Sequence, residues 1–308
     1  MIRMKSIGVV VLTLNAEKHL MHCLTPFLHS ALKPKILVVD SSSTDQTVNI
    51  AKNLGVEVLS ISRDTFNHGE TRELARRHLK TEIVVMVTPD AYAANSDLLE
   101  KLVTPIQSGQ ASIAYARQIP HLGAGFFEAF PRAFNYPPIS EVRCIADLRT
   151  YGSHTFFCSD SCAAYLNQAL DQIQGFKHVI LGEDTLATAE LLKLGHKIAY
   201  VADAQVYHSH CYSLRQEFSR YFDTGLMRKQ YEGILSSAVS DQVRGQRFAK
   251  EMLKQLLGQR PWMLPYALMH LFVKWGGYQL GQRSLHAPLW WKKLLSSQKY
   301  YWEKKASS

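Results

Sequence analysis

The chain has 308 residues, of which 46% are hydrophobic, so it has ample apolar material for a core and is not a disordered protein. Its 35 lysines and arginines outnumber 26 acidic residues, and the formal charge of +9 favours anionic partners: nucleotide phosphates, nucleic acid or an acidic membrane surface. The five cysteines lack zinc-site spacing and predict reduced thiols, and we expect neither a secretory signal peptide nor a membrane-spanning segment.

Strands and helices alternate over the first 110 residues. Runs of β-branched aliphatic residues predict strands buried on both faces, and Asn15 is a plausible N-cap for the first helix. This alternation predicts a mostly parallel sheet covered by helices. The predicted strands are 7–14, 35–40, 56–61 and 82–88, and the predicted helices are 15–32, 43–53, 69–79 and 95–107.

The later part of the chain is less regular at first. Residues 120–152 are rich in Pro, Gly and Phe and are expected to form an irregular segment that caps a site. Regular structure is expected again at 156–170 and 185–194, followed by a late strand at 197–206. After Ser213 the sequence becomes helical and basic, with tryptophans among the lysines and arginines.

Two acids end predicted strands. Ligands of open parallel sheets bind beyond the carboxyl ends of the strands, where Asp40 precedes a run of hydroxyl residues and Asp90 closes the run VVMVTPD. Asp40 can accept hydrogen bonds from a base or a ribose, or it can simply cap a helix. Asp90 can bind Mg²⁺ or Mn²⁺ held by a diphosphate. Neither a dinucleotide fingerprint nor a P-loop occurs near the first strands, and the two acids together favour a nucleotide-plus-metal site.

Two further motifs can carry chemistry. Glu183 and Asp184 begin a helix in the segment LGEDT, either as ordinary first-turn acids or as a general base with its neighbour. His208 and His210 alternate after the late strand in VYHSHCYS, so both can face one side. They can ligate a metal or bind phosphate, or their spacing can be a coincidence.

In this order, the motifs resemble those of the family 2 glycosyltransferases, over roughly residues 5–225. The resemblance implies an α/β, Rossmann-like GT-A fold for an inverting nucleotide-diphospho-sugar transferase, with a mostly parallel sheet flanked by helices. It divides the chain into a GT-A domain at 1–225 and a helical, basic and aromatic extension at 226–308. The segments that carry the resemblance are VVVLTLN (9–15), VVDSSSTDQT (38–47), VMVTPDA (85–91), GED (182–184) and YHSH (207–210).

The resemblance also implies roles for matching residues. Asp184 would be the catalytic base, supported by Glu183. Asp90 would hold a divalent cation, Mg²⁺ or Mn²⁺, with help from His208 or His210. Tyr92 stands where a second carboxylate is common, which leaves the need for metal open. The nucleotide sugar would be bound by Thr13, Asn15, Asp40, Ser42, Asn67, His68 and Arg72.

Donor and acceptor are also implied by resemblance. FNHGETRELA (66–75) and YSLRQEFSRYFDTG (212–225) are similar to segments of bacterial rhamnosyltransferases. This implies dTDP-rhamnose as donor and a lipid-linked saccharide as acceptor in O-antigen and lipopolysaccharide synthesis. A UDP- or GDP-sugar donor, or a non-catalytic GT-A-like binding protein, remains the alternative. The acceptor sugar and the linkage position stay open.

The aromatic and basic tail favours a location. Its composition suits an amphipathic surface in the headgroup region of a membrane, although a subdomain packed on the core or a homo-oligomer interface has the same composition. We expect a cytoplasmic enzyme, peripheral on the inner face of the bacterial cytoplasmic membrane.

Two other classes fit less well. A nucleotidyltransferase would carry a glycine-rich basic signature after the first strand, where this chain reads Asn15-Ala-Glu-Lys-His. A nucleic-acid partner is not expected, because the basic residues are dispersed early and gather among tryptophans late.

Overall fold

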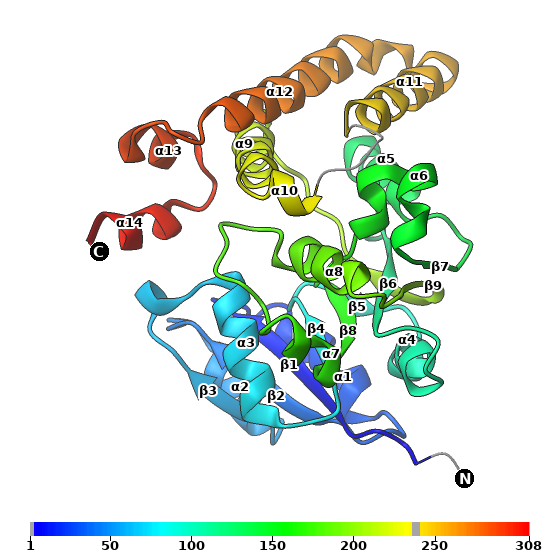
Figure 1. Ribbon diagram of the computed structural model, residues 1–308, viewed down its shortest axis with the longest axis vertical. Coiled ribbons are helices and arrows are strands. Elements are labelled where there is room, and N and C mark those ends of the chain that lie inside the picture. Colours follow the sequence, from blue (N-terminus) through cyan, green and yellow to red (C-terminus); the bar gives the residue numbers. More distant parts are fainter. Residues whose placement is uncertain (1–2, 236–240, 308) are drawn as a thin grey trace. The chain divides into compact units, whose positions relative to one another are not determined.

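The computed structural model describes residues 3–235 and 241–307, and Figure 1 shows the order of its helices and strands. The chain forms two compact units. The division expected from the sequence, into a GT-A domain at 1–225 and an extension at 226–308, stays a prediction. The first unit comprises Met1–Ala146, Thr155–His178 and Glu183–Ser209, and the second comprises Asp147–His154, Val179–Gly182 and His210–Ser308.

A nine-stranded sheet, counted over the described residues, forms the centre of the first unit. Its order is β3-β2-β1-β4-β8-β6-β9-β5, and β7 pairs with β9. Strands β5, β7 and β8 run antiparallel to the neighbours with which they pair, and the other strands are parallel to one another. The strands are β1 (Ile7–Thr13), β2 (Lys35–Asp40), β3 (Glu57–Ser60), β4 (Ile83–Val87), β5 (Tyr92–Ala93), β6 (Ile113–Ile119), β7 (Glu141–Arg143), β8 (Cys162–Leu166) and β9 (Ile198–Tyr207).

The helices of the first unit cover this sheet. Apolar residues of α1 and α4 join the strand residues Val9 and Val85 in the core, while α3 packs against β1 and β2. A Cβ on Gly8 would lie 2.7 Å from Leu79, so the glycine lets α3 approach the sheet closely. The helices are α1 (Leu20–Leu28), α2 (Thr47–Asn53), α3 (His68–Leu79), α4 (Leu98–Gln107), α5 (Phe126–Asn135), α7 (Asn167–Gln172) and α8 (Glu183–Lys193).

Most of the early strands and helices lie where the sequence predicts them, and three differences stand out. The first helix begins at Leu20, and Asn15 is not its N-cap. Residues 120–152, expected to be irregular, contain the helix α5 and the strand β7. Strand β6, which the pattern did not predict, occupies an inner position of the sheet between β8 and β9.

The second unit is helical. Helices α9 and α12 pack with their backbones in close approach, because Cβ atoms on Gly225, Gly277 and Gly281 would each lie within 2.5 Å of a carbonyl oxygen of the facing helix. No helix in the described ranges combines the length and apolarity needed to cross a bilayer. The helices are α6 (Leu148–Tyr151), α9 (Leu214–Gln230), α10 (Glu232–Leu235), α11 (Asp241–Gln259), α12 (Leu264–Arg283), α13 (Leu289–Leu295) and α14 (Lys299–Ser307).

Candidate active site

One edge of the sheet collects the acids that the sequence singles out. Strands β1, β2 and β4 are parallel, so their carboxyl ends, followed by Asp90 in the last case, lie at one edge. Strand β8 runs the other way and pairs Cys162 with Val87, which brings the preceding loop with Asp160 to the same edge. The backbone N–H of His208 donates to Ile119 at the end of β6, so the end of β9 lies there too.

Asp40 is buried and organises the loop that follows it. Its carboxylate accepts hydrogen bonds from the Thr13 hydroxyl (3.1 Å), the Ser43 backbone N–H (2.9 Å) and the Ser43 hydroxyl (2.5 Å). A buried carboxylate needs such donors. The hydroxyl run after Asp40 therefore folds the first part of this loop around the carboxylate.

Asn15 and Ser42 both have positive φ angles, of 51° and 64°. The Asn15 side-chain oxygen accepts a hydrogen bond of 2.9 Å from the backbone N–H of Thr44, and Ser42 donates one of 3.0 Å to the carbonyl of Ile61. Asparagine tolerates the left-handed conformation better than most residues. The first contact connects the loops after β1 and β2, and the second connects the loop after β2 to the residue that follows β3.

The start of α3 explains part of the FNHGETRELA segment. Asn67 is the N-cap, and its side-chain oxygen accepts from the backbone N–H groups of Gly69 (3.1 Å) and Glu70 (3.2 Å). A Cβ on Gly69 would lie 1.9 Å from the carbonyl oxygen of Lys177, so only glycine fits there. His68 is partly exposed, and its ring lies 4.9 Å from that of Phe66.

Arg72, one turn along α3, is buried between two acids. Its Nε lies 2.9 Å from Oδ2 of Asp160, and its Nη1 lies 2.8 Å from Oε1 of Glu183. The contact with Asp160 is an ion pair without hydrogen-bond geometry. Arg72 therefore neutralises the buried Glu183 and joins α3 to the start of α8.

Asp184 has a different environment from its neighbour Glu183. It is partly exposed, and its carboxylate accepts from the backbone N–H groups of Thr185 (2.6 Å) and Asp160 (3.2 Å). Desolvation of the carboxylate by the surrounding protein atoms, followed by the negative charge of Glu183, raises the pKa of Asp184 to about 6. A carboxylate poised in this range can accept a proton near neutral pH.

Asp160 is a site residue that the sequence interpretation missed. Burial raises its pKa and the charge of the nearby Arg72 opposes this, and the Tyr165 hydroxyl donates to its carboxylate at 2.6 Å. Cys158 and Cys162, two residues away on either side, are free, buried thiols. The acid between them was the available signal.

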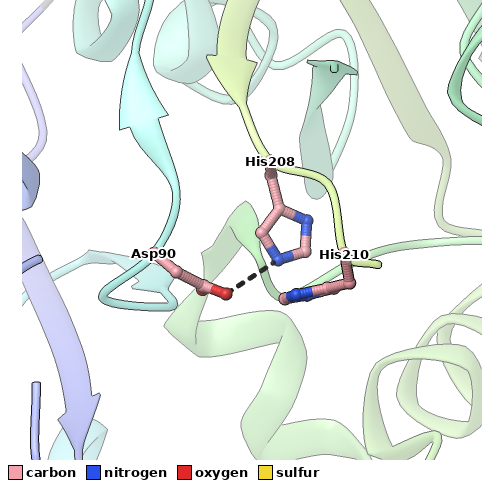
Figure 2. A group of neighbouring side chains, drawn as sticks. All are labelled: Asp90, His208 and His210. Atoms are coloured by element: carbon pink, nitrogen blue, oxygen red, sulfur yellow. Dashed lines mark ion pairs between the residues drawn. The ribbon is translucent and has the colours of Figure 1, made fainter. Parts of the chain in front are cut away.

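Asp90, His208 and His210 form a group of metal-ligand type (Figure 2). Pairing of Tyr92 with Tyr207 between β5 and β9 brings the loop of Asp90 beside the end of β9. Nε2 of His208 lies 3.5 Å from Oδ2 of Asp90, and the three possible ligand atoms lie within 4.8 Å of one another.

The orientation of His208 suits a ligand. Gln118 Oε1 accepts a hydrogen bond of 2.7 Å from Arg132 and lies 2.9 Å from His208 Nδ1. Nδ1 therefore carries a proton toward Gln118, and Nε2 is turned toward Asp90. Burial lowers the pKa of His208, which favours the neutral ring. A carboxylate oxygen and a neutral imidazole, held from behind by an amide, fit a divalent cation.

Tyr92 lies two residues after Asp90, where the family resemblance implies that a second carboxylate is common. Its hydroxyl hydrogen-bonds His19, and its ring lies 5.8 Å from that of His22 and 5.4 Å from that of His121. Three imidazoles therefore contact Tyr92, the residue at the position expected for a second acid.

Comparison with known proteins places this geometry in a family. Residues 8–174, more than half of the chain, match the family model described as Glycosyl transferase family 2. The chain is a family 2 glycosyltransferase. This confirms the expected family and the expected enzyme class.

The similar proteins cover almost the whole transferase. It is 35% identical over 300 residues to the O-antigen chain rhamnosyltransferase RfbN of Salmonella typhimurium, covering 96% of each chain. It is 36% identical over 270 residues to the O-antigen chain rhamnosyltransferase WbaN of Salmonella anatum, covering 87% of this chain and 86% of the other.

A solved structure supports the fold. The mannosyltransferase PcManGT from Pyrobaculum calidifontis, in complex with GDP-Man and Mn²⁺, has a TM-score of 0.54 and 18% identity, covering 99% of this chain and 87% of the other. The transferase has the expected GT-A-like α/β fold with a helical C-terminal region.

Proposed function

We propose that the transferase moves L-rhamnose from dTDP-rhamnose to a hydroxyl of a lipid-linked saccharide during O-antigen or related cell-surface polysaccharide synthesis. The observation that carries this proposal is the 35% identity to an O-antigen chain rhamnosyltransferase over 96% of both chains. Identity that extends over the whole chain includes the parts of the sequence beyond the shared sugar-transferase family model.

The chemistry is one inverting displacement with Asp184 as the base. Asp184 takes the proton of the acceptor hydroxyl while that oxygen attacks the anomeric carbon. The bond from that carbon to the diphosphate breaks, and the nucleoside diphosphate leaves from the opposite face. The partial exposure of Asp184 and its raised pKa support this role, whereas Glu183 is buried against Arg72 and supports its neighbour.

The nucleotide sugar is proposed to lie along the sheet edge. Thr13, Asn15, Asp40 and Ser42 shape the loops after β1 and β2, which supports a role in forming the nucleoside pocket. The start of α3 presents a helix N-terminus beside His68, which suits a diphosphate. Arg72 is proposed to act mainly through Glu183 and Asp160, with its contact to the sugar diphosphate still a prediction.

A divalent cation, Mg²⁺ or Mn²⁺, is proposed at Asp90, His208 and His210. The three possible ligands and the hydrogen bond from His208 to Gln118 favour a bound cation. The mannosyltransferase PcManGT, which has a similar fold, was solved in complex with Mn²⁺. When bound, such a cation offsets negative charge that develops on the departing diphosphate. Tyr92 leaves one carboxylate in the group, so we expect weaker metal binding than from two acids.

The acceptor and the location follow from the same proposal. A lipid-linked saccharide lies at a membrane surface, so the enzyme is proposed to act from the cytoplasm, peripherally on the inner face of the cytoplasmic membrane. A homo-oligomer remains compatible with this location.

The test is a donor panel. Purified transferase is incubated with dTDP-rhamnose, UDP-glucose, UDP-N-acetylglucosamine or GDP-mannose, with and without Mn²⁺, and nucleoside diphosphate release is measured with and without membrane extract. We expect release from dTDP-rhamnose to exceed the others at least tenfold and to rise with extract. Preference for another nucleotide sugar overturns the donor, and release from none of them overturns the catalytic assignment.

A further inference from the structure

Helix α12 in the second unit carries its side chains in an unusual distribution. Its buried residues include His270, Lys274, Gly277 and Gly281. Its exposed face is apolar, with Leu268 57% exposed, Met269 55%, Phe272 68% and Trp275 60%. At about 100° per residue these four side chains fall within one arc of about 120°. A helix of a water-soluble unit normally has the opposite distribution.

The face of α12 that packs against α9 is held by ion pairs and backbone contacts rather than by large apolar side chains. Glu217 of α9 lies 3.2 Å from Nε2 of His270 and 3.3 Å from Nζ of Lys274. Gly277 and Gly281 allow direct backbone contact with α9. Polar pairs and glycine contacts thus hold the two helices together, which leaves the large apolar residues of α12 without a role in that packing.

Other large apolar side chains are exposed on nearby segments of the sequence. Trp262 in the short 3₁₀ segment η4 (Pro261–Met263), Leu257 of α11, and Trp290 and Leu294 of α13 are all exposed. Large exposed apolar surfaces mark contact sites for proteins or membranes.

Charge separates these two possibilities. Residues 210–308 contain 16 lysines and arginines against 6 acids, whereas residues 1–209 contain 19 against 20. The net positive charge of the chain therefore belongs to the segment that carries the apolar face. A second copy would bring like charges together, while an anionic bilayer offers both opposite charge and an apolar phase.

We propose that the exposed apolar face of α12 (Leu268, Met269, Phe272 and Trp275) docks into the interfacial region of an anionic phospholipid bilayer. The helix lies along the surface with these side chains among the upper acyl chains, and the lysines and arginines of the second unit meet the headgroups. This deepens the proposed function, on which it rests, because it names the surface through which the enzyme meets a lipid-linked acceptor.

The test is vesicle flotation of the full chain. Vesicles of phosphatidylcholine with 30% phosphatidylglycerol are compared with pure phosphatidylcholine, for wild type and Phe272→Ser/Trp275→Ser. The matched control, Leu74→Ser/Leu194→Ser, removes two exposed apolar side chains from the first unit. We expect wild type and control to float with anionic vesicles, with at least a fivefold loss for the α12 variant and little flotation on neutral vesicles.

Further measurements keep the outcomes separate. Circular dichroism and the thermal midpoint check that the α12 variant folds, and light scattering reports its oligomeric state. Equal flotation of variant and wild type overturns the proposal, as does absence of wild-type flotation. If wild type is a dimer and the α12 variant is a monomer, the proposal is overturned, and the face is instead the contact with a second copy of the chain. Donor hydrolysis is measured separately without lipid, so failure of docking is distinguishable from failure of the proposed transfer reaction.

Discussion

The backbone N–H of Asp160 donates a hydrogen bond of 3.2 Å to the carboxylate of Asp184. The side chain of the same Asp160 pairs with Arg72, and Arg72 also pairs with Glu183. The proposed base, Asp184, is therefore oriented by Asp160, and Arg72 in turn holds the side chain of Asp160 in place. Both the protonation and the position of Asp184 depend on this buried group.

Substitution of the proposed base should separate chemistry from binding. Asp184→Asn keeps the shape of the side chain but removes the proton acceptor, so we expect turnover to fall about a thousandfold, within the usual range for a general base. Donor affinity, measured by calorimetry with dTDP-rhamnose, should change less than about threefold, since the helix and its neighbours remain. The exposed Asp203→Asn is the control, and near-normal turnover of Asp184→Asn removes it from the role.

The buried cation Arg72 should matter for stability. Arg72→Met leaves Glu183 and Asp160 buried without their countercharge, so we expect a loss of about 3–5 kcal/mol in the free energy of unfolding. Urea unfolding followed by circular dichroism measures this. Adding Asp160→Asn to Arg72→Met should recover part of the loss. Arg77→Met, which breaks an exposed pair with Glu73, should cost under about 1 kcal/mol. A similar loss at both arginines contradicts the interpretation.

The rate of transfer should depend on pH through Asp184. Its pKa is raised to about 6, so the carboxyl is protonated and inactive as a base below that pH, and kcat/KM should rise with pH through about 6 to a plateau. Glu183→Gln removes a negative charge that contributes to the raised pKa, and the acid limb should move to lower pH. A limb that stays in place when Glu183 is changed argues that another group titrates there.

Metal affinity should respond to a residue that is not itself a proposed ligand. Gln118→Leu removes the amide behind His208, and we expect the affinity for Mn²⁺ to fall about 10–100-fold, as is usual for groups that orient metal ligands. Titration of Mn²⁺ followed by electron paramagnetic resonance measures this without turnover. His208→Gln should lose more, and the exposed His286→Ala should lose nothing. Unchanged Mn²⁺ binding in His208→Gln eliminates this histidine as a ligand.

The local pattern of the sequence was enough for much of the fold. Residues 35–40 form a strand with the predicted bounds, because an uninterrupted run of aliphatic residues ending at a polar loop is a local signal. Strand β6 was missed because IAYARQI, with two alanines and the polar pair Arg117 and Gln118, lacks a continuous β-branched run, and its burial comes from β8 and β9, which are distant in sequence. Asn15 reads as a helix cap, but a hydrogen bond from Thr44, 29 residues later, accounts for its conformation.

The site shows the same division between local and distant contacts. Asp40, Asp90 and Asp184 stand at the ends or beginnings of regular elements, where position in the sequence already indicates a site. Asp160 and Gln118 could not be found in this way. Their importance lies in contacts with Arg72 and His208, which only the order of the strands brings near.

Gln118 has one more consequence for the enzyme. Its amide nitrogen donates to Ser159 at 2.8 Å, while its oxygen faces His208, and Ser159 directly precedes Asp160. A single side chain therefore connects the imidazole of the proposed metal site with the loop that orients the proposed base, Asp184. If metal binding moves this amide, the position of Asp184, and with it the ability of Asp184 to accept a proton, changes as well. By reciprocal linkage, the protonation state of Asp184 then changes the affinity for the metal ion.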